Sequence, residues 1–432
     1  MSKVQGNEVY IVDGARTPFL KARNKLGPFS ASDLALQTGR QLLSRYDFDP
    51  QNIDEVILGS AMPSADEANI ARLLALRLGC GSKVPAWTVM RNCASGMQAI
   101  DCAFQSIKLG RSGMVLAGGS DAMSRAPLLF NAKMANWLAM WFASKSMSQK
   151  VNLATQFRPS FFVPVIALLR GLTDPFVAMN MGQTAENLAH MFDVSRLQMD
   201  EFAALSHQRS LQSREILANE ITPIISEKGK VFEFDDGVRE DSTVQNLAKL
   251  KPFFDKKYGT VTAANSSQIT DGAALLMFAD KKTIKKHNLP VLAKIVDIEW
   301  AALSPETMGL GPVHAATPLM VRHGLTFDDI HLMEINEAFA AQVLGCIEAW
   351  KDDDYCRTHL GLDKAFGELS LDKLNVDGGA IACGHPIGAS GARIVLHLAK
   401  KLQLSDQKRA LATICIGGGQ GGAVLIERTD KV

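Results

Sequence analysis

This chain of 432 residues has few cysteines, and its net charge is close to zero. The seven cysteines are scattered and form no CxxC pair, which excludes a disulfide scaffold and argues against a structural zinc site. The 46 basic and 45 acidic residues nearly cancel, so the chain has neither the basic excess of a nucleic-acid-binding protein nor an acidic tail. We therefore expect reduced thiols in a cytoplasmic protein, with no metal and no nucleic-acid partner.

Long hydrophobic runs are also missing. Residues 1–10 hold no apolar run behind a charged start, so we expect no signal peptide, and residues 430–432 do not form a peroxisomal tripeptide. The apolar segment Phe161–Leu169 is too short to cross a bilayer, and Arg170 ends it. The length is too great for one ordinary core and predicts two or three lobes.

Short strand-like runs alternate with longer helical ones, which favours an α/β architecture. A weak internal repeat supports a duplication over the general self-similarity of α/β chains. IDEVILGS at Ile53–Ser60 resembles IHLMEIN at Ile330–Asn336, and each half then has a helix and a glycine-rich strand in the same order. The predicted strands are Val9–Val12, Val56–Leu58, Val115–Ala117, Ala274–Phe278, Ala293–Val296, Leu332–Ile335, Leu411–Ile414 and Ala423–Ile426.

The segment 126–180 differs from both halves. It carries an apolar stripe at helical spacing, and its charged residues are basic except for Asp174. An inserted subdomain with its own small core is the favoured interpretation. The alternative is a basic amphipathic surface for a lipid or a partner subunit. The stripe consists of Met134, Trp137, Leu138, Trp141 and Phe142.

Three segments carry residues that can perform thiol chemistry. Cys93 follows an apolar run and precedes a helical pattern, so we expect it at a strand-to-helix turn where the helix field lowers the pKa of a thiol. On its own, such a cysteine is more often a small buried apolar residue. His385 lies in a loop rich in glycine and proline, where a histidine can deprotonate a thiol. Cys415 ends a strand before Gly417, and the backbone N–H groups there can stabilise an oxyanion.

Motifs along essentially the whole chain resemble the thiolase family. One such motif would be suggestive, whereas the complete set in family order makes coincidence negligible. The motifs are ARTPF at 15–19, RNCASGMQA at 91–99, AGGSDAMSRAP at 117–127, MGQTAENLA at 181–189, AKLKPFF at 248–254, GTVTAANSSQITDGAA at 259–274, MGLGP at 308–312, NEAFAAQ at 336–342, GHPIGASGAR at 384–393 and CIGGGQGGA at 415–423.

The resemblance implies a role for each residue of the site. Cys93 corresponds to the nucleophile that accepts the acyl group, and His385 to the base that deprotonates it and then coenzyme A. Cys415 corresponds to the second cysteine, which exchanges a proton with the acetyl carbon. Asn336 holds a water and forms one oxyanion hole with His385, while the N–H groups of Cys93 and Gly417 form the other. Coenzyme A is a substrate here, and no cofactor is implied.

Coenzyme A contacts follow less directly from the pattern. Ser267 and Arg239 match family positions that touch pantetheine or nucleotide, and Met181 matches a pocket residue. Arg239 is as well explained as a solvated surface charge. The residue before Met181 is often histidine in relatives and is Asn180 here, which puts one pantetheine contact in doubt.

The implied activity is cleavage of 3-ketoacyl-CoA by coenzyme A, or the reverse condensation. The longer segment 126–180 resembles the β-subunits of fatty-acid oxidation complexes, so we expect it to line an acyl tunnel, bind an α-subunit or touch a membrane. Charging Trp137 and Trp141 would then impair long-chain turnover most. The alternatives are a biosynthetic enzyme that forms acetoacetyl-CoA, a ketoacyl synthase, which usually has histidine at the position of Cys415, and an inactive lipid-binding subunit.

The resemblance also implies a fold and an assembly. Two duplicated halves, each with a five-stranded sheet between helices, are expected to stack as five α-β-α-β-α layers. Residues 1–125 with about 255–283 would form the N-terminal half, 126–254 an inserted loop domain over the site, and 284–432 the C-terminal half. A homodimer or homotetramer is expected, with the edge of the first half buried between subunits.

Overall fold

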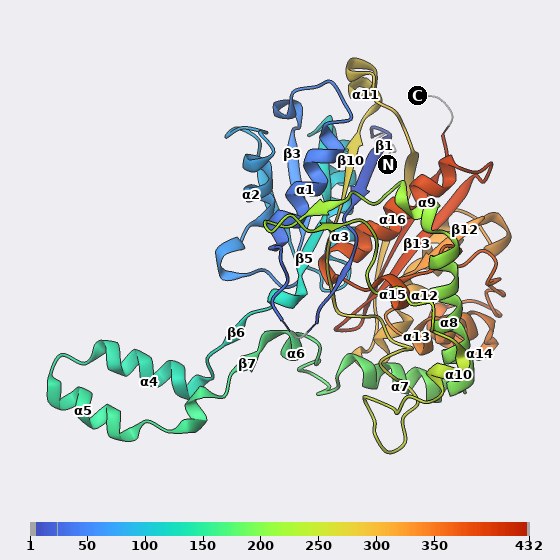
Figure 1. The fold of residues 1–432 in the computed structure, drawn as a ribbon. Coiled ribbons are helices and arrows are strands. Elements are labelled where there is room, and N and C mark those ends of the chain that lie inside the picture. The colour runs from blue at the N-terminus through green and yellow to red at the C-terminus, as the bar shows by residue number, and fades with distance from the viewer. Residues whose placement is uncertain (1–5, 24, 430–432) are drawn as a thin grey trace.

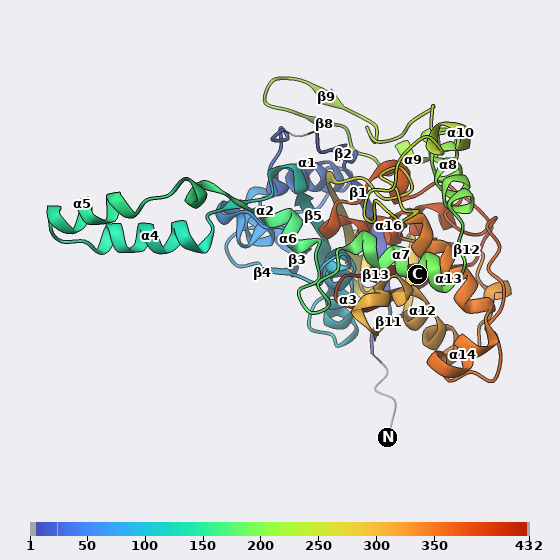
Figure 2. The same ribbon diagram turned by 90° about the horizontal axis from the view of Figure 1, so that it is seen from below.

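The computed structural model describes residues 6–23 and 25–429 (Figure 1). The expectation of no signal peptide rests partly on residues outside these ranges. The expectation that residues 430–432 form no peroxisomal tripeptide rests wholly on residues outside them. Two α/β halves form the body of the molecule, and a helical arm extends away from it in both views (Figure 1 and Figure 2). In the described part of the chain, no helix is long and apolar enough to span a membrane.

The first half is built on five strands in the order β4-β3-β5-β10-β1. All residues of β1, β5 and β10 are buried, as expected for strands with helices on both faces. A short strand, β2 (Leu20–Lys21), pairs with β10. The main strands are β1 (Val9–Arg16), β3 (Glu55–Gly59), β4 (Ala86–Val89), β5 (Met114–Ala122) and β10 (Thr270–Ala279).

The second half has four strands in the order β12-β13-β14-β11, and β11 pairs with β1 to join the halves into one sheet. The expected fifth strand is replaced by a single bridge between Met333 and Leu374. Asn375 has φ +46° directly after that bridge, and this conformation stops a strand. The strands are β11 (Ala293–Ala302), β12 (Leu332–Ile335), β13 (Arg409–Ile416) and β14 (Gln420–Glu427). Each of the eight predicted strands lies within an observed one.

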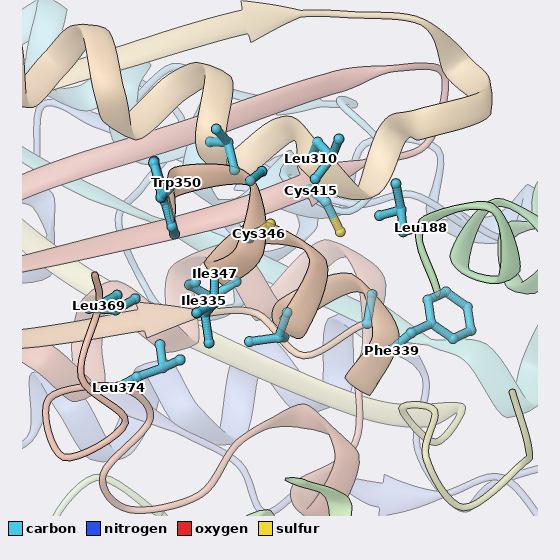
Figure 3. Packing of buried hydrophobic residues seen from close by; sticks show 14 of the residues in the cluster. Leu188, Leu310, Ile335, Phe339, Cys346, Ile347, Trp350, Leu369, Leu374 and Cys415 are labelled. Atoms are coloured by element: carbon cyan, nitrogen blue, oxygen red, sulfur yellow. The ribbon is translucent and has the colours of Figure 1, made fainter. Parts of the chain in front are cut away.

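Three apolar clusters separate the layers. One lies outside the first sheet, under α1 (Ala31–Leu43) and α2 (Ile70–Arg77). The middle cluster surrounds α3 (Ser95–Lys108) and α16 (Ile387–Gln403), which pack between the sheets. The third lies outside the second sheet, with α12 (Gly311–Arg322) and α13 (Ala340–Lys351), where Figure 3 shows Trp350, Cys346 and Cys415 together. The predicted five-layer order is therefore confirmed.

Close approach in the middle layer depends on glycine. A Cβ on Gly119 would collide with the carbonyl oxygen of Gly388, and a Cβ on Gly96 would lie 2.6 Å from the same atom. Because neither position carries a side chain, the starts of α3 and α16 meet at the ends of the strands. The segments of Cys93 and His385 precede these two helices.

The inserted segment forms the arm, a helical hairpin of α4 and α5 on a two-stranded stem. Trp137 donates to the carbonyl of Leu153 at 2.9 Å and stacks on Trp141, so the hairpin has a small core of its own, as expected. Most other apolar side chains of the arm are exposed. The elements are β6 (Leu128–Leu129), α4 (Ala132–Ala143), α5 (Met147–Gln156), β7 (Val165–Ile166) and α6 (Ala167–Gly171).

The remaining elements contact both halves. These elements are α7 (Met181–Met191), α8 (Arg196–Gln212), α9 (Arg214–Ala218), β8 (Ile224–Ile225), β9 (Val231–Phe232), α10 (Val244–Leu247), α11 (Lys281–His287), α14 (Asp353–Leu360) and α15 (Ala380–Cys383). Of these, α7, α8 and α14 pack on α13 of the second half, whereas β8 contacts α1 and α11 contacts β1 of the first. The domain boundaries inferred from the sequence stay a prediction.

Candidate active site

Cys93 lies in a tight turn between β4 and α3, as the sequence indicates. Asn92 has φ +43°, a left-handed conformation that asparagine tolerates better than most residues. The Ser95 hydroxyl closes the turn by accepting from the Arg91 N–H at 2.8 Å and donating to the Asn92 carbonyl at 2.7 Å. The turn therefore holds the Cys93 thiol at the start of α3.

The turn of Cys93 is tied to the loop after Cys415. The Asn92 side chain donates to the Gly417 carbonyl at 2.8 Å. Cys415 lies near the end of β13, is 1% exposed and packs in the apolar cluster of Figure 3. Gly418 and Gly419 both have positive φ, which lets the chain turn at once into β14. The Asn92 side chain thus joins the segments of the two cysteines.

The pKa of each thiol is raised, which corrects the expectation that the helix field lowers that of Cys93. Burial raises the pKa of Cys93 and outweighs the opposite effect of the Gly417 and Cys93 backbone N–H groups, while Asp121 raises it further. Burial also raises the pKa of Cys415 well above its ordinary value, and the nearby Cys93 adds to this. Both cysteines are therefore neutral thiols at neutral pH, and Cys93 needs a base to react.

His385 has the form of that base. Its Nδ1 lies 2.6 Å from the Ser390 hydroxyl, which itself donates to the Pro386 carbonyl at 3.0 Å. Because the hydroxyl has a single proton, Nδ1 must donate to it, which leaves Nε2 with a free lone pair. Burial, with the charge of Arg393, lowers the pKa of His385 to about 4. The imidazole is therefore neutral and able to accept a proton on Nε2.

Two buried polar atoms of the site have no hydrogen-bond partner in the described protein. They are Nε2 of His385 and Nδ2 of Asn336, on side chains 8% and 2% exposed. The backbone N–H of Asn336 donates to Thr413 at 3.0 Å, so the residue itself is held directly after β12. Unpaired buried polar atoms are rare and costly in native proteins. These two atoms are therefore available to bond a substrate, another ligand or an ordered water.

A cavity of about 420 Å³ reaches Cys93. Cys93, Gly417 and Met181 line it, together with Leu168, Gly171, Leu172 and Pro175 from the end of the inserted segment. Asn180 does not act as a pocket residue, because its side chain caps α7 by accepting from the Gln183 N–H at 3.0 Å. This cap explains the residue type that departs from the family pattern.

Ser267 and Arg239 occupy different positions. The Ser267 N–H donates to Ala338 at 2.9 Å, and the carbonyl of the next residue, Gln268, accepts from the His385 N–H at 3.0 Å. Ser267 therefore lies between the Asn336 turn and the His385 loop. Arg239 is exposed. Burial lowers the pKa of Lys21, and the charges of Arg239 and Arg23 lower it further. Neither Ser267 nor Arg239 lines the cavity.

The sequence interpretation missed Asp121. This buried carboxylate accepts from the Ser60 hydroxyl at 2.7 Å, from the Met62 N–H at 3.1 Å and from the Gly388 N–H at 2.6 Å. It therefore caps α16 and fixes the Ala61–Met62 wall of the cavity. The available signal was a charged residue inside an apolar strand. Among the residues described, no group of three or more His, Cys, Asp or Glu side chains is placed to hold a metal ion.

Comparison with known families matches both halves of the chain. Residues 9–282 match the family "Thiolase, N-terminal domain", and residues 289–428 match "Thiolase, C-terminal domain". A 3-ketoacyl-CoA thiolase of Pseudoalteromonas translucida is 33% identical over 98% of this chain and 97% of the relative. One of Yersinia enterocolitica is 34% identical over the same shares.

Solved structures agree with this match. Human mitochondrial 3-ketoacyl-CoA thiolase in complex with CoA is similar with a TM-score of 0.83 and 36% identity, covering 98% of each chain. An acetyl-CoA acetyltransferase from Bacillus anthracis has a TM-score of 0.83 and 33% identity, covering 98% of this chain and 100% of the other.

Proposed function

Since the chain belongs to the thiolase family, we propose that it cleaves 3-ketoacyl-CoA with coenzyme A through a thioester on Cys93. The products are acetyl-CoA and an acyl-CoA shortened by two carbons. The observation that carries this proposal is the pair of unpaired buried atoms, Nε2 of His385 and Nδ2 of Asn336, together with the hydrogen bond that joins the segments of Cys93 and Cys415. A degradative role in fatty-acid oxidation is part of the proposal.

Acylation begins with proton transfer from the Cys93 thiol to Nε2 of His385. The thiolate attacks the C3 carbonyl, and the backbone N–H groups of Cys93 and Gly417 stabilise the tetrahedral oxyanion. The C2–C3 bond then breaks, leaving the acyl group on sulfur and an enolate of acetyl-CoA. The newly protonated His385 and a water held by Asn336 donate to the enolate oxygen, where one donor is typically worth about 3 kcal/mol.

Proton delivery to the enolate carbon falls to Cys415. Its raised pKa supports this role, because the thiol stays protonated until the enolate forms. Protonated His385 passes its proton to the Cys415 thiolate, and acetyl-CoA leaves. The neutral imidazole then takes the thiol proton of a coenzyme A molecule, whose sulfur attacks the acyl-Cys93 carbonyl, and it returns that proton to Cys93 as the thiolate leaves. Breakdown of this second tetrahedral intermediate releases the shortened acyl-CoA and restores Cys93.

The cavity wall supports a substrate with an acyl chain beyond acetoacetyl. Leu168 and Leu172 are apolar wall residues contributed by the end of the inserted segment. Trp137 and Trp141, which we expected to influence chain length, pack on each other in the arm and do not line the cavity. The acyl-tunnel role is therefore assigned to α6 and the loop after it.

Ser267 is proposed to contact pantetheine, because its backbone joins the Asn336 turn to the His385 loop. Arg239 is proposed to attract the phosphates of coenzyme A together with Lys21 and Arg23, whose charges influence one another. Met181 is proposed as a wall of the acyl pocket, which its place in the cavity lining supports.

Assembly and location complete the proposal. β4 is an edge strand with Trp87 and the adjacent Met90 exposed, which supports pairing of two copies into a homodimer and then a homotetramer. The arm has exposed apolar side chains and only basic charges between residues 126 and 173, which supports contact with an anionic membrane or an α-subunit. A cytoplasmic location fits two catalytic thiols that must stay reduced.

Mass spectrometry after addition of acetoacetyl-CoA tests the mechanism. An acetyl adduct on Cys93 is expected, and its absence would instead support an inactive lipid-binding subunit. The rate of thiolysis against chain length then separates the two thiolase roles. A maximum beyond the four-carbon substrate indicates degradation, whereas activity confined to acetoacetyl-CoA indicates the biosynthetic enzyme.

A further inference from the structure

A second buried carboxylate lies directly beside Asn336. Glu337 is 1% exposed and uses both oxygens. One accepts from the Asn375 side chain at 2.9 Å, and the other accepts from the Ser206 hydroxyl at 2.7 Å and from the Ile381 N–H at 3.0 Å. The contacts come from α8, the turn at 375 and α15, so one side chain joins three separate segments.

These contacts surround the two segments that carry the unpaired atoms. Asn375 pairs with both backbone groups of Ile335, at 2.9 and 3.0 Å, and Ile335 directly precedes Asn336. Ile381 lies on α15, which leads through Gly384 to His385. A Cβ on Gly379 would collide with the carboxylate of Glu337, so the glycine there makes room for it.

His385 and Asn336 are held differently. The imidazole of His385 is fixed by Ser390 and its backbone by Gln268, whereas Glu337 reaches the His385 loop only through the Ile381 N–H, four residues upstream. Outside its own turn, where its carbonyl accepts from the Ala338 N–H, the Asn336 backbone bonds only to Thr413, and its Nδ2 has no protein partner. The position of its amide relative to His385 therefore depends on the turn that Glu337 and Asn375 fix.

We propose that Glu337 is a positioning residue that holds the Asn336 amide at the correct distance from Nε2 of His385, and that it serves the carbon–carbon step selectively. This inference rests on the proposed function. Cleavage of the C2–C3 bond needs both donors on the enolate oxygen. Transfer of an acetyl group between coenzyme A and Cys93 needs His385 and the N–H groups of Cys93 and Gly417, but not the Asn336 amide.

Glu337→Gln is the sharpest variant because it keeps the volume. Its amide group must face either the Asn375 amide or the Ile381 N–H, and both are donors. Asn375 does not accept by rotating, because that would break both bonds to Ile335. The conflict therefore displaces the turn of Asn336 without opening a cavity.

Two reactions are compared on the full-length enzyme. Thiolysis of acetoacetyl-CoA breaks a carbon–carbon bond, whereas exchange of labelled coenzyme A into acetyl-CoA does not. For Glu337→Gln we expect kcat of thiolysis to fall about 10²-fold, with KM for coenzyme A nearly unchanged. The loss in exchange is expected to be at least about tenfold smaller. Equal losses in both reactions, or undiminished thiolysis, overturn the proposal.

Two further variants keep the test decisive. Ser206→Ala removes one of the three hydrogen bonds to Glu337 and is expected to lower the ratio of thiolysis to exchange by a smaller factor. If Glu337→Gln does not fold, this ratio in Ser206→Ala tests the proposal in its place. Glu220→Gln is the matched control, since Glu220 is 2% exposed but pairs with Arg16 and His397 instead. Its ratio of thiolysis to exchange is expected to stay that of the wild type. A wild type with neither reaction refutes the proposed function itself.

Discussion

The catalytic centre and the arm depart from ordinary burial in opposite directions. At the centre, polar atoms are buried without partners: Nδ2 of Asn336 belongs to a side chain that is only 2% exposed. On the arm, apolar side chains face solvent, and Phe142 is 81% exposed. Each arrangement costs free energy in the isolated chain, and we propose that a substrate relieves the first and a membrane or partner protein the second.

This contrast separates two roles that the sequence analysis gave to one segment, 126–180: lining the acyl site and binding a membrane or partner. One wall of the cavity belongs to the end of the inserted segment, at 168–176. The hairpin of α4 and α5 extends away from the body (Figure 2), and none of its residues lines the cavity. Changes at the centre are therefore expected to affect chemistry on every substrate. Changes on the hairpin are expected to affect only where the enzyme binds.

Loss of the nucleophile gives the largest effect. Cys93→Ser is expected to abolish the acyl adduct and to lower thiolysis by at least about 10³-fold, because a hydroxyl is a far weaker nucleophile than a thiolate. Intact mass and thiolysis rates measure both. An undiminished rate would place the chemistry elsewhere. Cys102→Ser, at a partly buried cysteine of α3, is the control and is expected to keep the adduct.

Loss of Cys415 is expected to separate acetyl transfer to Cys93 from cleavage of the carbon–carbon bond. Cys415→Ser is expected to accept acetyl from acetyl-CoA on Cys93 while thiolysis falls by about 10² to 10⁴-fold, because the proton donor for the enolate is gone. Exchange of labelled coenzyme A into acetyl-CoA measures the acetyl transfer that the variant retains. Loss of exchange to the same degree would contradict the role given to Cys415.

Filling the cavity wall tests where the acyl chain lies. Leu172→Trp is expected to lower kcat/KM for long 3-ketoacyl-CoA about 10 to 10²-fold, because each methylene left in water costs about 0.8 kcal/mol, and to spare acetoacetyl-CoA. A profile of kcat/KM against chain length measures this. Trp137→Ala on the arm is the control, and a chain-length effect there would return the acyl site to the hairpin.

The buried ion cluster around His397 gives the stability of the body a characteristic dependence on pH. Nδ1 of His397 lies 2.9 Å from Glu220 and Nε2 lies 3.2 Å from Asp377, and these carboxylates raise the pKa of His397 to about 9 despite burial. Its contribution is thus complete below the unfolded pKa of about 6.5 and is lost as the pH rises through about 9.

His397→Gln is expected to lower Tm by a few degrees at pH 6.5 and to flatten the decline of Tm between pH 6.5 and about 9. The acid side serves as an internal control. Burial lowers the pKa of both His207 and His385 to about 4, so stability falls as the pH drops from 6.5 towards 4 in wild type and variant alike. If Tm of the variant declined between pH 6.5 and about 9 as it does in the wild type, the alkaline loss of stability would not come from His397.

Polar substitutions on the arm give the smallest effect on the enzyme. Phe130→Ser with Phe142→Ser is expected to reduce sedimentation with anionic phospholipid vesicles and to leave acetoacetyl-CoA thiolysis unchanged, with stability altered by about 0.5 kcal/mol or less. Leu404→Ser, equally apolar and 61% exposed on the body, is the control. Vesicle binding that persists in the arm variant would show that the arm is not the lipid-binding surface. The exposed apolar side chains of the arm would then be assigned to a protein partner.

Local patterns were enough to predict much of this molecule. The eight strands, the helices at α3 and α16 and the hairpin stripe follow from periodicity, which depends only on neighbouring residues. The candidate residues Cys93, His385 and Cys415 were identified from short motifs on the same grounds. Their roles stay predictions that the variants above test.

Only the tertiary structure decided how these segments meet. The opposite sign of the Cys93 pKa shift comes from burial by distant segments, which no local motif reports. Separation of Trp137 from the cavity, the pairing of β1 with β11 and the contacts of Glu337 likewise join residues far apart in the chain. The sequence by itself determined the elements and the reactive groups, whereas packing determined their distances, their protonation and which polar atoms were left for a substrate.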